Sequence, residues 1–91
     1  PPVTFAYISE DDLHRNIVEQ DNLLLCCQVS RSDAIVQWYK DGVELKPSDN
    51  VLIEAENTLR RLIVLSAQLS DSGTYTCRAG DSALIFKVNV R

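Results

Sequence analysis

The residues of this chain that are able to do chemistry are few and are poorly placed for catalysis. His14 is the only histidine among the 91 residues, and it lies in an acidic stretch without a neighbouring serine or cysteine. A general base needs partners positioned within hydrogen-bond reach. We therefore interpret His14 as an exposed loop residue, and we expect no catalytic site and no enzyme activity.

The cysteines and acidic residues do not suit a metal ion, and the glycines do not suit a cofactor. Cys26 and Cys27 are adjacent, so in an extended strand they point to opposite faces and cannot chelate one zinc ion together with Cys77. The aspartates are scattered without the spacing of a calcium loop. Each of the three glycines is explained by a turn, and no glycine-rich phosphate loop is present. We expect no metal site and no cofactor.

Size, charge and composition limit the classes of function. The 91 residues, of which 45% are hydrophobic and lie in short runs, suffice for one folded core. The longest apolar run, Leu23–Cys27, is too short to cross a membrane. A net charge of −4 disfavours nucleic acids and anionic membranes as partners, because both attract basic surfaces. No signal peptide is present, but this says little. The two opening prolines and the end at Arg91 lead us to expect a single domain, residues 1–91, excised from a larger protein.

Cysteine usage favours a reducing compartment. Three cysteines are an odd number, and a leftover thiol in a secreted domain would need a partner in another molecule. No Asn-x-Ser/Thr glycosylation site occurs in the chain. Both observations favour an intracellular protein, and neither decides the question.

A two-residue alternation of apolar and polar residues predicts β-strands along most of the chain. The expected strands are Val3–Ile8, Asn16–Glu19, Leu23–Val29, Ile35–Lys40, Val43–Leu45, Val51–Ala55, Thr58–Leu65, Thr74–Ala79 and Ala83–Val90. We expect Ser9–Arg15 to be a charged interruption, Asp41-Gly42 a tight hairpin turn, and Ala67 and Leu69 to close the end of the core. Many short strands without intervening helices predict an all-β sandwich of two antiparallel sheets.

The phase of one strand decides which of the two adjacent cysteines is buried. Cys27 alternates in step with Leu25 and Val29, so we expect it to point into the core. Cys26 then points outward. A slip of one residue would exchange the two and bury Gln28 instead.

One arrangement of residues is specific for a fold. Cys27 is followed eleven positions later by Trp38, and the stretch Asp71-Ser-Gly-Thr-Tyr75-Thr-Cys77 lies further along. This order resembles an immunoglobulin domain over nearly the whole chain. The resemblance implies a Greek-key sandwich with one cysteine in each sheet, the tryptophan packed over both, and the tyrosine hydrogen-bonded to the preceding bend. The expected core residues are Cys27, Trp38, Leu62, Tyr75 and Cys77.

Further stretches narrow the resemblance to one type of immunoglobulin domain. The sequence Val36-Gln-Trp-Tyr-Lys-Asp-Gly-Val-Glu-Leu45 is similar to the signature of intermediate-set (I-set) domains in giant sarcomeric and cytoskeletal proteins. Leu25–Ser30, Ser32–Val36 and Arg61–Ala67 also resemble those domains. The likeness is greatest to the obscurin and obscurin-like family, and titin and myosin-binding protein C are near neighbours.

The resemblance implies a non-catalytic module of a cytoplasmic, cytoskeleton-associated scaffold that links cytoskeletal or myofibrillar assemblies. Its expected partners are other proteins, including immunoglobulin domains of titin-like or myomesin-like proteins, bound by pairing of edge strands. The candidate partner edge comprises Val3, Phe5, Tyr7, Ile17 and Val18. Val43–Leu45 beside Val51–Ala55 is a second candidate edge. We expect the isolated domain to be monomeric.

Several alternatives remain open at this point. The acidic Ser9–Arg15 stretch is able to block edge pairing by charge, and the domain is either a spacer or a partner-binding module. The family also implies that Asp71 pairs with a basic residue, either Arg60 or Arg61. Whether Cys27 and Cys77 form a disulfide depends on the compartment. With that disulfide, the chain would suit an extracellular adhesion or receptor domain.

Overall fold

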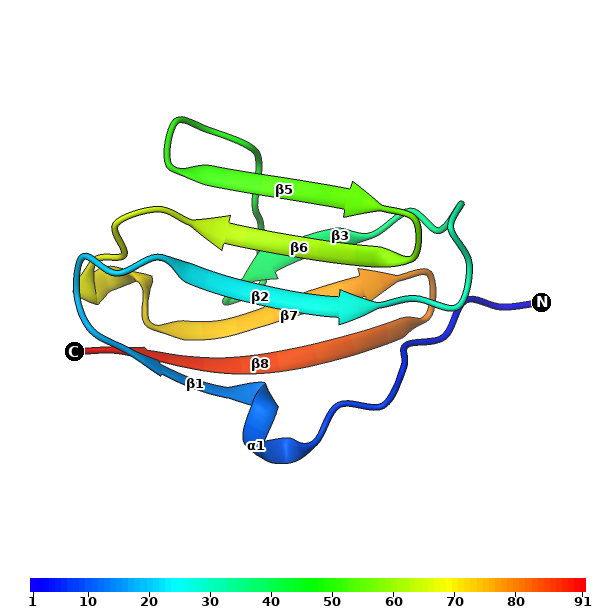
Figure 1. Cartoon of the computed structure of the whole chain (residues 1–91), viewed down its shortest axis with the longest axis horizontal. Helices are drawn as coiled ribbons and strands as arrows, with labels where there is room; N and C mark the ends of the chain where they lie inside the picture. Colours follow the sequence, from blue (N-terminus) through cyan, green and yellow to red (C-terminus); the bar gives the residue numbers. More distant parts are fainter.

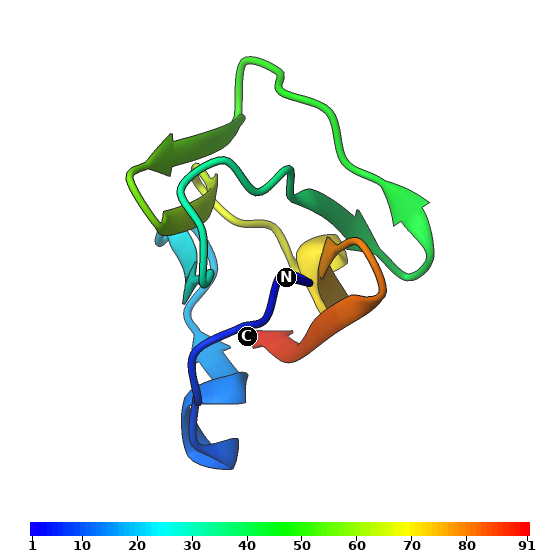
Figure 2. The ribbon, with the colours of Figure 1, turned by 90° about the vertical axis from the view of Figure 1, so that its right-hand side faces the viewer.

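Two β-sheets packed face to face form the protein, and the computed structural model describes all residues from 1 to 91 (Figure 1). The elements in chain order are α1 (Glu10–Leu13), β1 (His14–Ile17), β2 (Leu23–Gln28), β3 (Gln37–Lys40), β4 (Val43–Glu44), β5 (Val51–Glu56), β6 (Leu59–Val64), the 3-10 turn η1 (Leu69–Asp71), β7 (Gly73–Ala79) and β8 (Ser82–Val90). The five-stranded sheet has the order β1-β8-β7-β3-β4, and the three-stranded sheet has the order β2-β6-β5. Figure 2 shows the same strands turned by 90°. The predicted all-β sandwich is confirmed.

One strand pair departs from the predicted antiparallel pattern. β1 runs parallel to β8, with His14 opposite Lys87 and Ile17 opposite Val90, whereas every other pair of strands is antiparallel. The cause is a crossing of the chain, which first runs beside β2 in the small sheet and then joins the edge of the large one. The expectation of two wholly antiparallel sheets is therefore wrong at this edge.

The expected first strand, Val3–Ile8, is reduced to a single bridge. Phe5 pairs with Val29, and the Ala6 N–H donates to the carbonyl of Gln28 at 2.9 Å. Beyond these contacts the segment leaves β2, because α1 redirects the chain toward the other sheet (Figure 1).

The charged stretch Ser9–Arg15 is an ordered turn of helix followed by strand, where we expected an interruption. The N–H of Asp12 donates to Ser9 Oγ at 3.4 Å, and α1 carries acidic residues in its first turn, where the helix dipole favours them. β1 begins two residues earlier than expected, at His14. His14 is exposed but belongs to a strand, and its Nδ1 lies 2.9 Å from the carbonyl of Glu10. No helix in the structure is long and apolar enough to span a bilayer.

The core forms where the inward faces of the two sheets meet. Trp38, Tyr75 and Phe86 are its largest buried side chains, and the ring centroids of Trp38 and Phe86 lie 6.1 Å apart. The indole Nε1 of Trp38 is buried without a hydrogen-bond partner, so packing alone holds this ring. The structure buries every residue expected in the core: Cys27, Trp38, Leu62, Tyr75 and Cys77.

The alternation in β2 follows the predicted phase. Leu25 and Cys27 are buried, whereas Leu24 and Cys26 between them are exposed. The same period places Leu62 inward on the neighbouring strand β6. The strand register that selects Cys27 as the core cysteine is therefore the observed one.

The bend before β7 is held by its tyrosine and its aspartate. The Tyr75 hydroxyl donates to the Asp71 carbonyl at 2.6 Å, and the Asp71 carboxylate accepts the N–H of Gln68 at 2.7 Å. Burial, together with the negative charge of Asp71, raises the pKa of Tyr75. Ala67 closes the end of the core as expected, but Leu69 is 55% exposed, so that part of the expectation is wrong.

The expected ion pair between Asp71 and Arg60 or Arg61 is wrong. Arg61 points outward and pairs with Glu54 at 3.2 Å across the strands. Arg60 points inward, is only 5% exposed, and lies at the far end of its strand from the bend that contains Asp71. Its guanidinium donates to four backbone carbonyls, those of Ser32, Ala34, Asn57 and Leu59. Arg60 therefore ties two loops together at one end of the sandwich.

The Asp41-Gly42 turn between β3 and β4 is confirmed and is clamped to β7. Asp41 and Gly42 have positive φ angles of 49° and 86°, as a tight primed turn requires. The Asp41 carboxylate accepts the N–H of Thr74 at 3.0 Å, and this bond, with the nearby charge of Lys40, lowers the pKa of Asp41. Gly73 is needed beside it, because a Cβ there would lie 2.8 Å from the Asp41 carboxylate.

The packing of the indole predicts that Trp38→Ala lowers the free energy of unfolding by about 3–5 kcal/mol, the range for a buried large aromatic residue. Ile35→Ala is the control, because this side chain is exposed and its loss should change stability by less than about 0.5 kcal/mol. Denaturant unfolding followed by fluorescence and circular dichroism measures both. Equal losses in the two variants would contradict the assignment of the core.

The lowered pKa of Asp41 predicts an acid-dependent contribution to stability. Because the folded-state pKa lies below the ordinary value of 3.8, the contribution is complete above that value and is lost as pH falls through the folded-state pKa. The difference in unfolding free energy between wild type and Asp41→Asn should therefore shrink from about pH 5 to about pH 2. Asp49→Asn, in an exposed loop, is the matched control. A difference that does not vary with pH would contradict this role of Asp41.

Candidate protein-binding edges

The outer edge of β1 is an unpaired row of backbone groups. The Ile17 carbonyl accepts the N–H of Arg91 at 3.0 Å, and the Glu19 N–H donates to the Arg91 carbonyl at 2.6 Å. Since the backbone groups of successive residues in a strand point to opposite sides, those of Asn16 and the N–H of Val18 face away from β8. These groups are free to pair with a strand from another protein.

The side chains along β1 alternate between positions that face the core and positions that face solvent. Ile17 packs against the core, whereas Val18 just beyond the strand is 53% exposed. His14 and Asn16 are exposed. An added strand would thus meet a firmly held backbone with one apolar and two polar side chains beside it.

The N-terminal segment forms a second, shorter edge, on the small sheet. The Thr4 carbonyl and the Ala6 N–H bond to the β2 side, so the backbone groups of Phe5 face outward. The Phe5 side chain is partly buried against the core, whereas Tyr7 is 91% exposed. The Val3 carbonyl is occupied, because it accepts the Ser82 hydroxyl at 3.0 Å.

The five residues expected to form one partner edge therefore lie on two edges, one in each sheet. Val3, Phe5 and Tyr7 belong to the segment beside β2, and Ile17 and Val18 belong to the β1 side. The turn of α1 separates the two groups. A signal for this turn was present in the sequence, since Ser9 followed by three acidic residues is a helix start.

The other expected pair of edges also belongs to two different sheets. Val43–Leu45 corresponds to β4, which ends the large sheet, and Val51–Ala55 corresponds to β5, which ends the small one. The backbone groups of Val51 already bond to Ser48, so the open part of β5 begins at Ile53. Two exposed glutamates alternate along this open part of β5, and such charges are a common protection of strand edges.

The two core cysteines lie in contact and carry thiols in the structure. Their Sγ atoms are 3.3 Å apart, well beyond the length of about 2.05 Å of a disulfide bond. The hydrogen bond between the two thiols lowers the pKa of Cys27, and the charge of Arg60 acts in the same direction. The same hydrogen bond, together with burial, raises the pKa of Cys77. Cys26 is exposed on the opposite face of β2.

The burial of Arg60 is not among the expectations from the sequence, although the sequence contains a signal for it. It alternates in phase with Leu62 and Val64, which the sequence places inward. A charged residue in that phase needs several acceptors, because burial of an unpaired charge is costly. The four carbonyls that surround Arg60 meet this need without a carboxylate.

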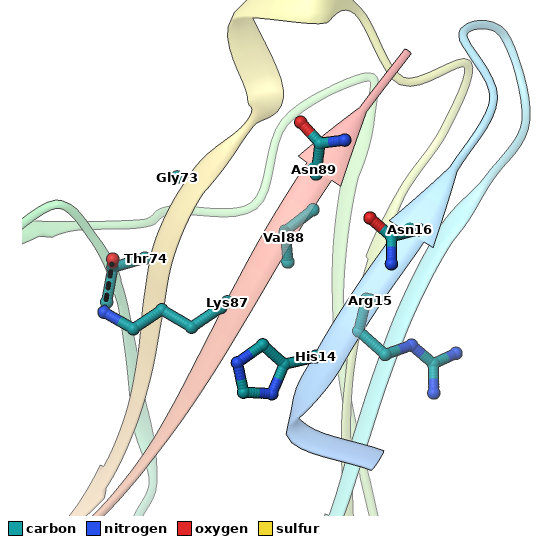
Figure 3. Close-up of a pocket in the computed structure, with 8 residues that line it drawn as sticks. All are labelled: His14, Arg15, Asn16, Gly73, Thr74, Lys87, Val88 and Asn89. Atoms are coloured by element: carbon teal, nitrogen blue, oxygen red, sulfur yellow. Dashed lines mark hydrogen bonds between the residues drawn. The ribbon is translucent and has the colours of Figure 1, made fainter. Parts of the chain in front are cut away.

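The structure contains no group of three or more His, Cys, Asp or Glu side chains arranged to hold a metal ion. Its surface depressions are open to solvent. One, of about 310 Å3, lies across β1, β8 and β7, where Lys87 reaches toward Thr74 and the His14 ring lies beside it (Figure 3).

Comparison with known proteins identifies the class of the domain. Residues 8–88 match the model of the family described as "Immunoglobulin I-set domain", and the chain belongs to this family. Domains of this kind are typically non-catalytic structural modules.

The similar proteins include several from muscle. An Ig-like domain of obscurin-like protein 1 from Homo sapiens is 38% identical, with 98% of each chain covered and a TM-score of 0.84. The titin homolog of Caenorhabditis elegans is 40% identical over 65 residues, 71% of this chain. Hemicentin-1 of Mus musculus is 40% identical over 72 residues, 75% of this chain. The chain spans 1% or less of the length of these two curated relatives.

The strand phase predicts the order in which the thiols react. In the folded protein Cys26 should be alkylated by iodoacetamide well before Cys27 and Cys77, because the latter two are buried. Mass spectrometry of peptides from briefly labelled native protein measures this order. Equal labelling of Cys26 and Cys27, or labelling of Cys27 first, would contradict the register of β2.

Proposed function

We propose that this chain is one interaction and structural module of a larger, cytoplasmic scaffold protein of the sarcomeric type. The observation that carries the proposal is the open backbone edge of β1, formed by Asn16 and Val18. The similarity to a domain of obscurin-like protein 1 supports the muscle-type cytoskeletal setting. The module works by binding and holding other proteins, and it performs no reaction.

The shape of the domain supports a place in a tandem array. The two termini leave at opposite ends of the long axis, which measures 40 Å (Figure 1). Modules joined in this way form an extended chain in which each domain passes load to the next. The residues 1–91 then constitute one such unit.

Edge pairing at β1 supplies the binding mode. A partner strand laid along β1 would extend the five-stranded sheet by one strand and would satisfy the outward groups of Asn16 and the N–H of Val18. Immunoglobulin domains of titin-like or myomesin-like proteins, which have edge strands of their own, are suitable partners. The acidic turn α1 lies next to this edge and repels acidic strands, so it selects among partners by charge.

A second candidate is an extracellular adhesion or receptor domain. The contact between Cys27 and Cys77 supports it, since a small movement would allow a disulfide, and so does the similarity to hemicentin-1, a relative outside the muscle group. A count of free thiols in denatured, non-reduced protein from its native compartment separates the two candidates. Three thiols support the cytoplasmic scaffold, and one thiol supports the extracellular domain.

The binding mode predicts the effect of proline at the two sheet edges. Asn16→Pro removes an outward N–H of β1 without removing a bond to β8, so it should weaken binding of a titin-like or myomesin-like immunoglobulin domain by at least about tenfold. Ala55→Pro is the matched control, because it changes an outward position on β5. Calorimetry against a panel of such domains measures both variants.

Either of two outcomes would count against edge pairing at β1. One is equal binding of a panel domain by wild type and Asn16→Pro. The other is loss of binding in the Ala55→Pro control alone. Thermal unfolding of each variant shows that the fold is intact.

A further inference from the structure

Four strands of the five-stranded sheet carry basic but no acidic side chains, although the domain as a whole is acidic. The protein carries a net charge of −4, yet no aspartate or glutamate points outward from β1, β8, β7 or β3. The basic side chains on this face are those of Lys87 and Arg78, with His14 at its margin. Three carboxylates border this face: Glu44 on the edge strand β4, Asp41 beside Thr74, and Glu10 of α1, which lines a surface depression together with Ile85 and Lys87.

The two basic side chains of this face are without a bound carboxylate. Lys87 and Arg78 are both exposed, and neither forms an ion pair. The Nζ of Lys87 donates only to the Thr74 hydroxyl, at 3.2 Å (Figure 3). The neighbouring carboxylate of Asp41 is occupied by the Thr74 N–H and by Lys40, at 3.5 Å.

The strand register places an exposed apolar residue between the two cations. Across β7 and β8, Arg78 lies opposite Ala83, Thr76 opposite Ile85, and Thr74 opposite Lys87. Ile85 is 49% exposed, so an apolar side chain stands in the row between the two charges. The surface depressions border these same residues, one at Arg78 and another that Ile85 and Lys87 both line.

We propose that this face, defined by Arg78, Ile85 and Lys87, binds an acidic segment of a partner protein in extended conformation. Along the paired strands β7 and β8, the residue pair that contains Arg78 and the pair that contains Lys87 are four residues apart, which corresponds to about 13 Å. An extended chain spans this distance in four residues, and its positions i, i+2 and i+4 share one side. The segment that fits is therefore acidic at i and i+4 and apolar at i+2.

This surface is separate from the edge of β1. Edge pairing uses outward backbone groups, whereas the basic face uses the side chains of Arg78, Ile85 and Lys87 and attracts carboxylates. The domain would thus hold two partners of different chemistry, or two parts of one partner.

The test uses a fluorescein-labelled peptide, Gly-Glu-Ser-Leu-Ser-Glu-Gly, and an analogue in which both glutamates are glutamine. Titration of isotope-labelled domain should shift the amide resonances of β7 and β8, and the affinity should fall as salt is added. Lys87→Glu and Arg78→Glu should each weaken binding by about tenfold. Lys46→Glu is the matched control, because it changes the same charge at a site outside the face, and it should leave the affinity unchanged.

Three results would overturn the proposal. These are equal binding of the glutamine analogue, resonance shifts confined to other strands, and no saturable binding at millimolar peptide. Ile85→Asn keeps the charges and should weaken the peptide whose central residue is leucine, but not one whose central residue is serine. Asn16→Pro should leave peptide binding intact, so failure of this proposal and failure of edge pairing are distinguishable.

Discussion

The closure of two sheets around Trp38 is the constraint on which the rest of the structure depends. Its indole has no polar partner and is held by packing beside Phe86, while Cys27 and Cys77 approach from opposite sheets. Once this contact is made, the two-residue period of each strand decides which side chains are buried. The same period decides which side chains and which backbone groups remain available to partners.

Core packing also determines which groups are exposed at both candidate binding surfaces. Because Phe86 and Val88 face the core from β8, Ile85 and Lys87 must face solvent. On the β1 side, the bonds of Ile17 and Glu19 to Arg91 leave the backbone of Asn16 outward. Core packing therefore determines which groups of this domain are available for binding. Charge then selects among partners, because the acidic turn α1 lies beside the edge of β1 and cations lie on the face of the large sheet.

Much of this arrangement could be predicted from the sequence. The phase of Cys27 and the turn at Gly42 follow from local patterns, because alternation and positive φ angles act over a few residues. The hydrogen bond of Tyr75 was implied by the resemblance to immunoglobulin domains. The crossing of the first segment could not be predicted in the same way. It depends on which of two distant strands, β2 or β8, the chain joins, and local patterns do not encode that choice.

Charged residues were the other source of error. Asp71 was expected to pair with an arginine, but its carboxylate is satisfied within the bend by Gln68, and Arg60 is satisfied by carbonyls. Family resemblance suggested the ion pair, whereas alternation with Leu62 already indicated that Arg60 points inward. Where the two disagreed, the physical pattern of this chain was the better guide.

Amide hydrogen exchange of the folded domain, read residue by residue by NMR, tests the central claim most directly. If core packing leaves the β1 edge open, the amides of Asn16 and Val18 exchange rapidly while the amide of Glu19, bonded to Arg91, is protected. Strong protection at Asn16 and Val18 in the monomeric protein would show that this edge is already paired, and would contradict the account.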